Sequence, residues 1–139
     1  MRAVADTSVI VAAALRSGAG HRESREAIHT SEAGAAGHAW IESFSVLTRL
    51  PPDVRLSAAD AARVLGSVVA TTRYLSAREQ VGFAAWVRQS GVVGGAVYDA
   101  LVGWVAKCAE LPLLTRDARA LPTYRSLGIE TLIVAPTLA

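Results

Sequence analysis

An aspartate interrupts the apolar sequence near the start of the chain, in the segment AVADTSVIVAAAL. Residues 3–5 are apolar and predict a short strand, whereas residues 9–15 predict a helix that ends near Gly18. Asp6 therefore lies where a buried strand passes into a buried helix. This position limits the possible folds, because a carboxylate between two buried elements needs hydrogen-bond donors or a cation.

The rest of the chain alternates predicted helices with short apolar strands. Helices are predicted at 23–30, 38–50, 57–69, 77–89, 96–111 and 118–127, with Ser57 and Ser76 as helix caps. Strands are predicted at 34–37, 72–75, 113–115 and 130–134. This alternation is typical of an α/β fold with a mainly parallel central sheet flanked by helices. The chain has 139 residues and no linker or repeat, so we expect a single domain, residues 1–139.

Three acids are expected at one edge of this sheet. Asp6 follows the first strand, Asp117 follows the strand LLT, and Glu42 lies in the first turns of the helix after the second strand. The carboxyl ends of parallel strands share one edge, which is where ligands bind in such sheets. Topology alone therefore gathers these three carboxylates.

Asp99 is in a different setting, within GGAVYDALVGWVA. The sequence after it is nearly all apolar, so its helix should be buried and its carboxylate at least half buried. Each acid also has a simpler explanation. Asp6 and Asp117 can cap helices, Asp99 can favour the positive end of a helix dipole, and Glu42 can be a solvated surface residue.

Four acids with few nearby bases would repel one another, and a divalent cation would remove that repulsion. Oxygen ligands without a histidine or cysteine cluster favour Mg²⁺ or Mn²⁺ over zinc. The chain has three histidines, and they are too scattered in sequence to suggest a ligand set.

Composition narrows the class of protein further. No stretch reaches the roughly 18 apolar residues of a membrane helix, and the amino terminus does not resemble a signal peptide. Cys108 is the single cysteine, which argues against an internal disulfide and a cysteine-built zinc site. We expect a cytoplasmic protein with no membrane association. Among 14 basic residues only Lys107 is a lysine; arginine suits phosphate contacts, although such a bias also follows genomic base composition.

Four segments resemble the acidic blocks of PIN-domain ribonucleases, in particular the VapC-type toxins of VapBC toxin–antitoxin pairs. These segments are VADTSVIVAA, HAWIESFSVLTRLP, GGAVYDALVGWVAK and LPLLTRDARA, in the family's order and spacing. The resemblance implies a PIN-like fold and a catalytic, metal-binding quartet of Asp6, Glu42, Asp99 and Asp117. It also implies one or two Mg²⁺ or Mn²⁺ ions, cleavage of single-stranded or looped RNA, a homodimer, and a cognate VapB-type antitoxin.

Hydroxyl residues accompany the acids in these blocks. Thr115 matches the hydroxyl residue that often precedes the fourth acid by two positions, and Thr7 and Ser8 match hydroxyls beside the first. These hydroxyls can support the site or simply cap helices. Capping by Thr7 and Ser8 would leave Asp6 free to bind a metal.

Two arginines lie beside Asp117 and are candidates for contacts with flanking phosphates of the substrate. They are Arg116 and Arg119, and the simpler interpretation is that both are solvated. Arg119 stands where many relatives carry a further Asp or Asn. Because of this difference, it stays open whether a second metal binds and whether Asp117 helps to hold it.

Two alternatives belong to other functional classes. The first is a catalytically degenerate PIN-like module that binds RNA or a protein without cutting, which the complete acidic quartet disfavours. The second is a phospho-acceptor receiver domain. Receivers usually show an adjacent acidic pair after the first strand and a lysine after a late strand. Here Asp6 stands alone and Lys107 falls inside a predicted helix.

Overall fold

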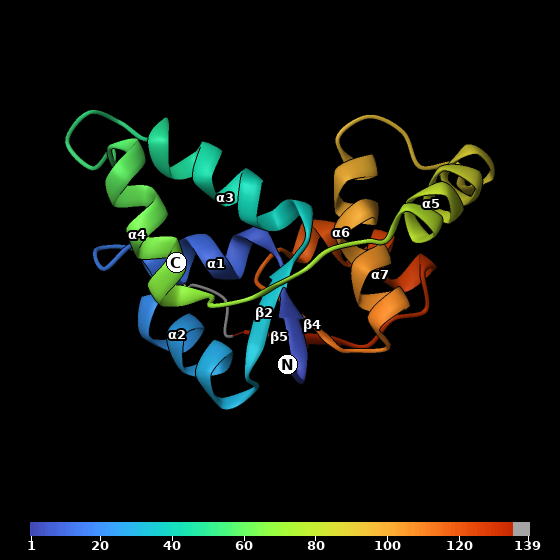
Figure 1. The fold of residues 1–139 in the computed structure, drawn as a ribbon, viewed down its shortest axis with the longest axis horizontal. Coiled ribbons are helices and arrows are strands. Elements are labelled where there is room, and N and C mark those ends of the chain that lie inside the picture. The colour runs from blue at the N-terminus through green and yellow to red at the C-terminus, as the bar shows by residue number, and fades with distance from the viewer. Residues whose placement is uncertain (135–139) are drawn as a thin grey trace.

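The computed structural model describes residues 1–134 and contains a parallel sheet between two groups of helices (Figure 1). The strands are β1 (Ala3–Ala5), β2 (Ala33–Ala36), β3 (Thr72–Arg73), β4 (Leu113–Thr115) and β5 (Thr131–Ile133). Their order is β3-β2-β1-β4-β5, and every neighbouring pair is parallel. The predicted α/β architecture with a parallel central sheet is confirmed.

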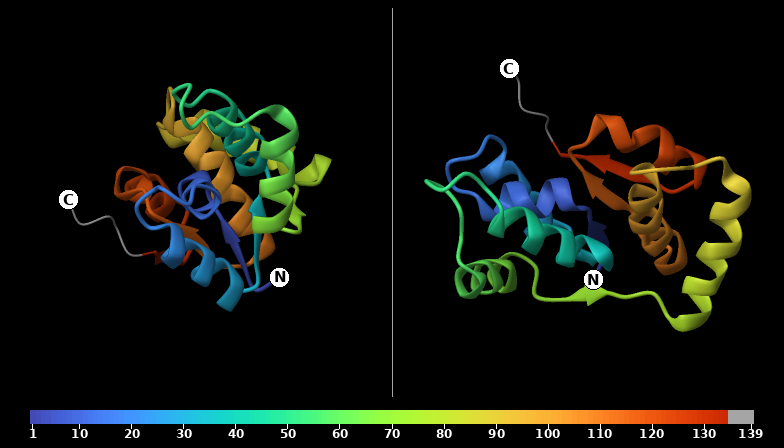
Figure 2. Two further views of the ribbon diagram at one scale, coloured as in Figure 1. Left: turned by 90° about the vertical axis from the view of Figure 1, so that its left-hand side faces the viewer. Right: turned by 90° about the horizontal axis from the view of Figure 1, so that it is seen from above.

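The helices follow the predicted order, with shifts of a few residues at their ends. They are α1 (Thr7–Ala14), α2 (His21–Thr30), α3 (His38–Thr48), α4 (Ala58–Val68), α5 (Ala77–Ser90), α6 (Ala96–Ala109) and α7 (Leu121–Ser126). In Figure 1 helices α1 to α4 lie to the left of the sheet and α5 to α7 to its right, an arrangement that Figure 2 also shows from above. Ser57 and Ser76 cap α4 and α5 as predicted.

The helix predicted at 118–127 is divided in two. A 3₁₀ turn, η1 (Ala118–Ala120), comes first, and α7 then begins at Leu121. Pro122 lies in the first turn of α7. A proline has no N–H to donate and is tolerated in a first turn but not in a helix interior, so the continuous helix was a wrong prediction.

The two strands at the centre of the sheet consist of small or medium side chains and are completely buried. β1 reads AVA and β2 reads AGAA. Small side chains let helices pack closely on both faces, and Val9, Ile10 and Leu47 from α1 and α3 join this core. The second strand looked weak in sequence because it lacks branched residues, yet its burial is what stabilises it.

The strand order reverses at β1, whose neighbours are β2 on one side and β4 on the other. A sheet of this kind opens a crevice at the carboxyl ends of the strands beside such a reversal. Gly37 makes the turn from β2 into α3 with φ of +49°, a conformation that favours glycine. A Cβ there would approach Val105 Cγ2 to 3.2 Å, so the glycine also permits the close packing of this turn on α6.

Within residues 1–134 no helix combines the length and the apolar character that crossing a membrane requires.

Candidate active site

A cavity of about 180 Å³ lies at the carboxyl ends of β1, β2 and β4. The four acids singled out in the sequence, Asp6, Glu42, Asp99 and Asp117, all line it. Asp6 follows β1, Glu42 comes from α3, Asp117 follows β4, and Asp99 comes from the first turn of α6. The structure therefore brings to one cavity acids as far apart in sequence as Asp6 and Asp117, near opposite ends of the chain.

Asp6 is the most buried of these acids, with 4% of its surface exposed. Its Oδ1 accepts hydrogen bonds from the Ser8 hydroxyl at 2.5 Å and from the Val9 amide at 3.3 Å. Its Oδ2 accepts from the hydroxyls of Thr115 at 2.5 Å and Tyr124 at 2.9 Å. Four donors match the roughly four acceptor positions of an ionised carboxylate. The hydrogen bonds offset part of the cost of burial, which nevertheless raises the pKa of Asp6.

Of the capping alternatives left open for α1, the structure bears out Asp6 and contradicts Thr7 and Ser8. Asp6 itself is the N-cap, because its side chain accepts from the Val9 amide. The two hydroxyls turn to the acids instead: Thr7 donates to Glu42 Oε2 at 3.1 Å, and Ser8 donates to Asp6. The Asp6 carboxylate therefore both caps α1 and lines the cavity.

Two hydroxyls also connect the end of β4 to Asp6. Ser8 Oγ accepts from the Arg116 amide at 2.8 Å while it donates to Asp6. Thr115 Oγ1 accepts from the Asp117 amide at 3.0 Å while it donates to the other oxygen of Asp6. Each hydroxyl thus has both a donor and an acceptor. This arrangement fixes the orientation of Asp6 relative to the segment that carries Asp117.

Tyr124 is a component of the site that the sequence did not reveal. It comes from α7, is 1% exposed, and lines the cavity as well as donating to Asp6. Burial, followed by the charge of Asp6, raises the pKa of its phenol, so the hydroxyl stays a donor. Sequence offered one signal: a buried tyrosine hydroxyl usually has a polar partner. That partner is 118 positions away, which no local pattern shows.

Asp99 lines the cavity from the first turn of α6 and is partly buried. Burial raises the pKa of its carboxyl, the guanidinium of Arg119 lowers it, and the charges of Asp117, Glu42 and Asp6 raise it. All three other acids are therefore near enough to repel its negative charge. A cation in the cavity would reverse this effect by favouring the ionised forms.

Asp117 and Arg119 form an ion pair at the mouth of the cavity, with 3.0 Å between Oδ2 and Nη2. The Asp117 side chain also caps η1 by accepting from the Arg119 amide at 3.0 Å. The Arg119 side chain is 80% exposed and lines the cavity. The Arg116 guanidinium lies elsewhere, against Gly20 at the start of α2. The structure thus places Arg119, and not the Arg116 side chain, among the cavity residues.

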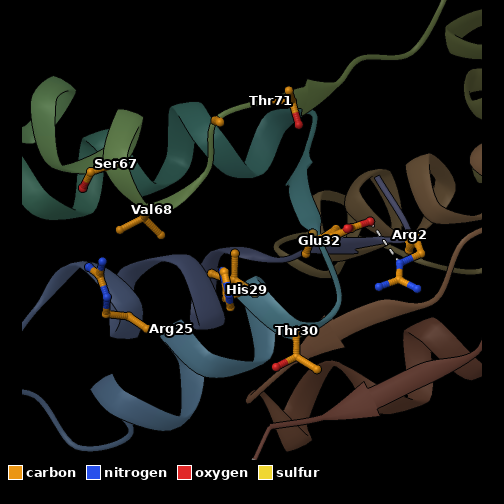
Figure 3. Close-up of a pocket in the computed structure, with 11 residues that line it drawn as sticks. Arg2, Arg25, His29, Thr30, Glu32, Ser67, Val68 and Thr71 are labelled. Atoms are coloured by element: carbon orange, nitrogen blue, oxygen red, sulfur yellow. Dashed lines mark ion pairs between the residues drawn. The ribbon is translucent and has the colours of Figure 1, made fainter.

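A larger hollow of about 570 Å³ lies at the opposite edge of the sheet, near the amino ends of β1, β2 and β3 (Figure 3). Its ionisable lining residues are Arg2, Arg25, His29 and Glu32, and Arg2 pairs with Glu32 at 3.0 Å. None of the four clustered acids reaches it. Size alone would favour this larger hollow, whereas the four carboxylates that line the smaller cavity make that cavity the candidate site.

Comparison with known proteins agrees with this geometry. The family model of the PIN domain matches residues 3–125, a span that contains all four acids. This chain belongs to the PIN-domain family. Ribonuclease VapC27 of Mycobacterium tuberculosis is 41% identical over 130 residues, which cover 94% of this chain and 95% of the relative. Ribonuclease VapC40 of the same organism is 38% identical over 130 residues, covering 93% and 96%.

The donor chemistry of this PIN-domain cavity fits a hard divalent cation. Its acidic ligands are all carboxylates, and no histidine or cysteine lines it. Within residues 1–134, however, no three acidic, histidine or cysteine side chains converge closely enough to form a ready-made cluster. Mg²⁺ does not require one, because it commonly keeps several waters and binds proteins through one or two carboxylates. The cavity therefore fits a partly hydrated ion.

Proposed function

We propose that this PIN-domain protein is a metal-dependent endoribonuclease and the toxin of a type II toxin–antitoxin pair. The observation that carries the proposal is the single small cavity lined by four carboxylates from four separate parts of the fold. The relatives named ribonucleases align over almost the whole chain, which supports RNA as the substrate. The reaction is hydrolysis of a phosphodiester bond, leaving 5′-phosphate and 3′-hydroxyl ends.

Each acid has a proposed role that follows from its position. Asp6 and Asp99 both line the cavity and are the proposed principal ligands of Mg²⁺ or Mn²⁺. Glu42, held by the Thr7 hydroxyl, ligates the ion or orients the attacking water. Asp117, held by Arg119, helps bind a second ion or its water shell.

The metal supplies Lewis-acid chemistry: it polarises the phosphoryl group and makes water a stronger acid near neutral pH. The protein supplies orientation. Ser8, Thr115 and Tyr124 fix the Asp6 carboxylate, so little reorganisation is needed when charge develops on the phosphoryl oxygens. Arg119, exposed at the mouth, is the proposed contact for a flanking phosphate of the RNA.

The proposed partners are an RNA substrate, a cognate VapB-type antitoxin and a second copy of this chain in a homodimer. They are inferred from the similarity to proteins named VapC. The cytoplasm is the proposed compartment, since RNA targets and an antitoxin made alongside the toxin would both be found there.

The proposal is tested by incubating the protein with a mixed RNA pool in Mg²⁺, in Mn²⁺ and in a chelator. Defined fragments that appear only with metal support the nuclease. RNA that is bound but never cut would instead support the degenerate binding module. Mapping the fragment ends then begins to identify the RNA sequence that is cut.

A further inference from the structure

An exposed aromatic stack lies beside the acidic cavity. The rings of His38 and Tyr98 are 5.3 Å apart between centroids and 16° from parallel. His38 begins α3 and is partly buried, whereas Tyr98 lies in the first turn of α6 with 56% of its surface exposed. A single exposed aromatic ring is ordinary on a protein surface, so it is the position of this stack near the acids that is informative.

The position of the stack relative to the acids follows from the two helices. Tyr98 directly precedes Asp99 in α6, and His38 lies four residues before Glu42 in α3. Four residues of α-helix span about 6 Å, so His38 and Glu42 are one turn apart on the same face of α3. The stack is therefore about one nucleotide's reach from two of the four acids.

Tyr98 is accessible from solvent, with 56% of its surface exposed. In the loop before α6, Val93 is exposed, and Cβ atoms placed on Gly94 and Gly95 would meet no atom within 4 Å. A planar group can therefore reach the exposed ring of Tyr98. His38 holds the tyrosine ring from one side, which reduces the conformational entropy that the ring would lose on binding.

We propose that the His38–Tyr98 stack binds an unpaired nucleobase next to the phosphodiester bond that is cut. Single-stranded RNA is commonly held by aromatic rings on which bases stack, and any base can stack because each has a π-face. The subsite would select unpaired RNA over duplex, because a paired base is not free to move onto the tyrosine. This inference rests on the proposed nuclease function and names the two residues that would bind an unpaired base of its substrate.

The contact favours a base over a protein side chain for a structural reason. Tyr98 directly precedes Asp99, which lines the cavity where the scissile phosphate is proposed to lie. A strand whose phosphate occupies the cavity must place a neighbouring nucleotide near the cavity mouth. A protein partner would need only apolar surface at position 98, whereas a stacked base needs a flat aromatic ring there. Substitutions of Tyr98 that keep or remove the ring can therefore distinguish the two partners.

The test measures RNA binding without cleavage. Short single-stranded oligoribonucleotides carrying one 2-aminopurine are titrated with protein in a chelator, in an Asp99→Asn background that keeps the RNA intact. In that background Tyr98→Ala should weaken binding about tenfold and abolish the quenching of 2-aminopurine. Tyr98→Phe should retain both, and Tyr98→Leu should behave like the alanine variant. Val81→Ala, which removes an exposed side chain from α5, is the matched control and should change neither.

Three results would overturn the subsite: no RNA binding in the background protein, unchanged binding in Tyr98→Ala, or full binding in Tyr98→Leu. Loss of dimerisation in Tyr98→Ala with unchanged RNA binding would assign the stack to a protein interface. The nuclease proposal is judged separately by metal-dependent cleavage with the wild-type protein. Base stacking on Tyr98 without RNA cleavage would refute the nuclease proposal but support the base-binding subsite. RNA cleavage without base stacking would support the nuclease proposal but refute the subsite.

Discussion

The hydroxyl of Tyr124 donates a hydrogen bond to Oδ2 of Asp6 over 2.9 Å, joining residues 118 positions apart in sequence. This bond ties the last described helix to the carboxylate that follows the first strand. The first and last acidic segments of the chain are therefore held as one unit, with Thr115 as the second donor to the same oxygen.

Replacing Tyr124 by phenylalanine should destabilise the protein by about 2 kcal/mol, because a buried carboxylate loses a charge-assisted hydrogen bond. Mn²⁺ should raise the melting temperature of this variant more than that of the wild type, since a cation can replace the lost donor at Asp6. Thermal unfolding with and without Mn²⁺ measures both effects. Tyr74→Phe, at an exposed tyrosine, is the control and should change neither. Equal metal shifts in Tyr124→Phe and wild type would argue against Asp6 as a ligand.

Replacing Asp99 by asparagine should raise the melting temperature in a chelator, because three nearby carboxylates repel the native charge. The same variant should lose most of the stabilisation that Mn²⁺ gives the wild type. Differential scanning calorimetry at several metal concentrations measures this. Asp53→Asn, at an exposed acid outside the cavity, should leave the metal response intact. A full metal response in Asp99→Asn would remove Asp99 from the ligand set.

Replacing Arg119 by glutamine should weaken RNA binding and lower the slope of log affinity against log salt by about one. The reason is that one phosphate contact and its released counterion are lost. Fluorescence anisotropy over a salt series measures the slope. Arg88→Gln, at an exposed arginine on α5 that does not line the cavity, is the matched control. An unchanged slope in Arg119→Gln would leave Arg119 as a partner of Asp117 only.

Glu79 should contribute to stability in a pH-dependent manner. Its two carboxylate oxygens accept from Arg73 at 3.1 and 2.9 Å, and these bonds lower its pKa from 4.5 to about 2. A lowered pKa in the folded state means that the stabilisation is complete above pH 4.5 and is lost as the pH falls through 2. Glu79→Gln should therefore lower the melting temperature at pH 7, and the difference from wild type should vanish near pH 2.

A matched control for Glu79 is Glu23→Gln, which removes an exposed ion pair with Arg22 at 3.6 Å. Exposed pairs contribute little, so this variant should differ little from wild type at any pH. A deficit in Glu79→Gln that stays constant from pH 7 to acid would show that packing of the side chain, and not its charge, stabilises the link between β3 and α5.

Much of the fold was predictable because the signals are local. Short apolar strands, the capping serines Ser57 and Ser76, and helix periodicity identified the parallel α/β arrangement. Topology then placed Asp6, Glu42 and Asp117 at one edge of the sheet. Only the family resemblance predicted that Asp99 would join them, since no strand precedes its helix. Strand order therefore predicted the positions of three acids, whereas the position of Asp99 depends on how its helix packs.

The remaining features depend on contacts between distant residues. Three contacts could not be predicted from sequence periodicity. They are the hydrogen bond of Tyr124, the stack of His38 on Tyr98, and the contact of the Arg116 side chain with Gly20. The choice between the capping alternatives for α1 also depended on the fold. Asp6 takes the N-cap position, so Thr7 and Ser8 lie inside the helix. Their hydroxyls donate to Glu42 and Asp6.

The central claim is that the four-carboxylate cavity cuts RNA with a divalent metal. The most direct measurement compares wild type with Asp99→Asn on one RNA pool, with Mn²⁺ and with a chelator, and maps the fragment ends. The wild type should give defined fragments with 5′-phosphate ends with Mn²⁺ only. A folded Asp99→Asn protein should cut at a rate lower by on the order of 100-fold or more. Cleavage by Asp99→Asn at the wild-type rate, or by the wild type in the chelator, would contradict it.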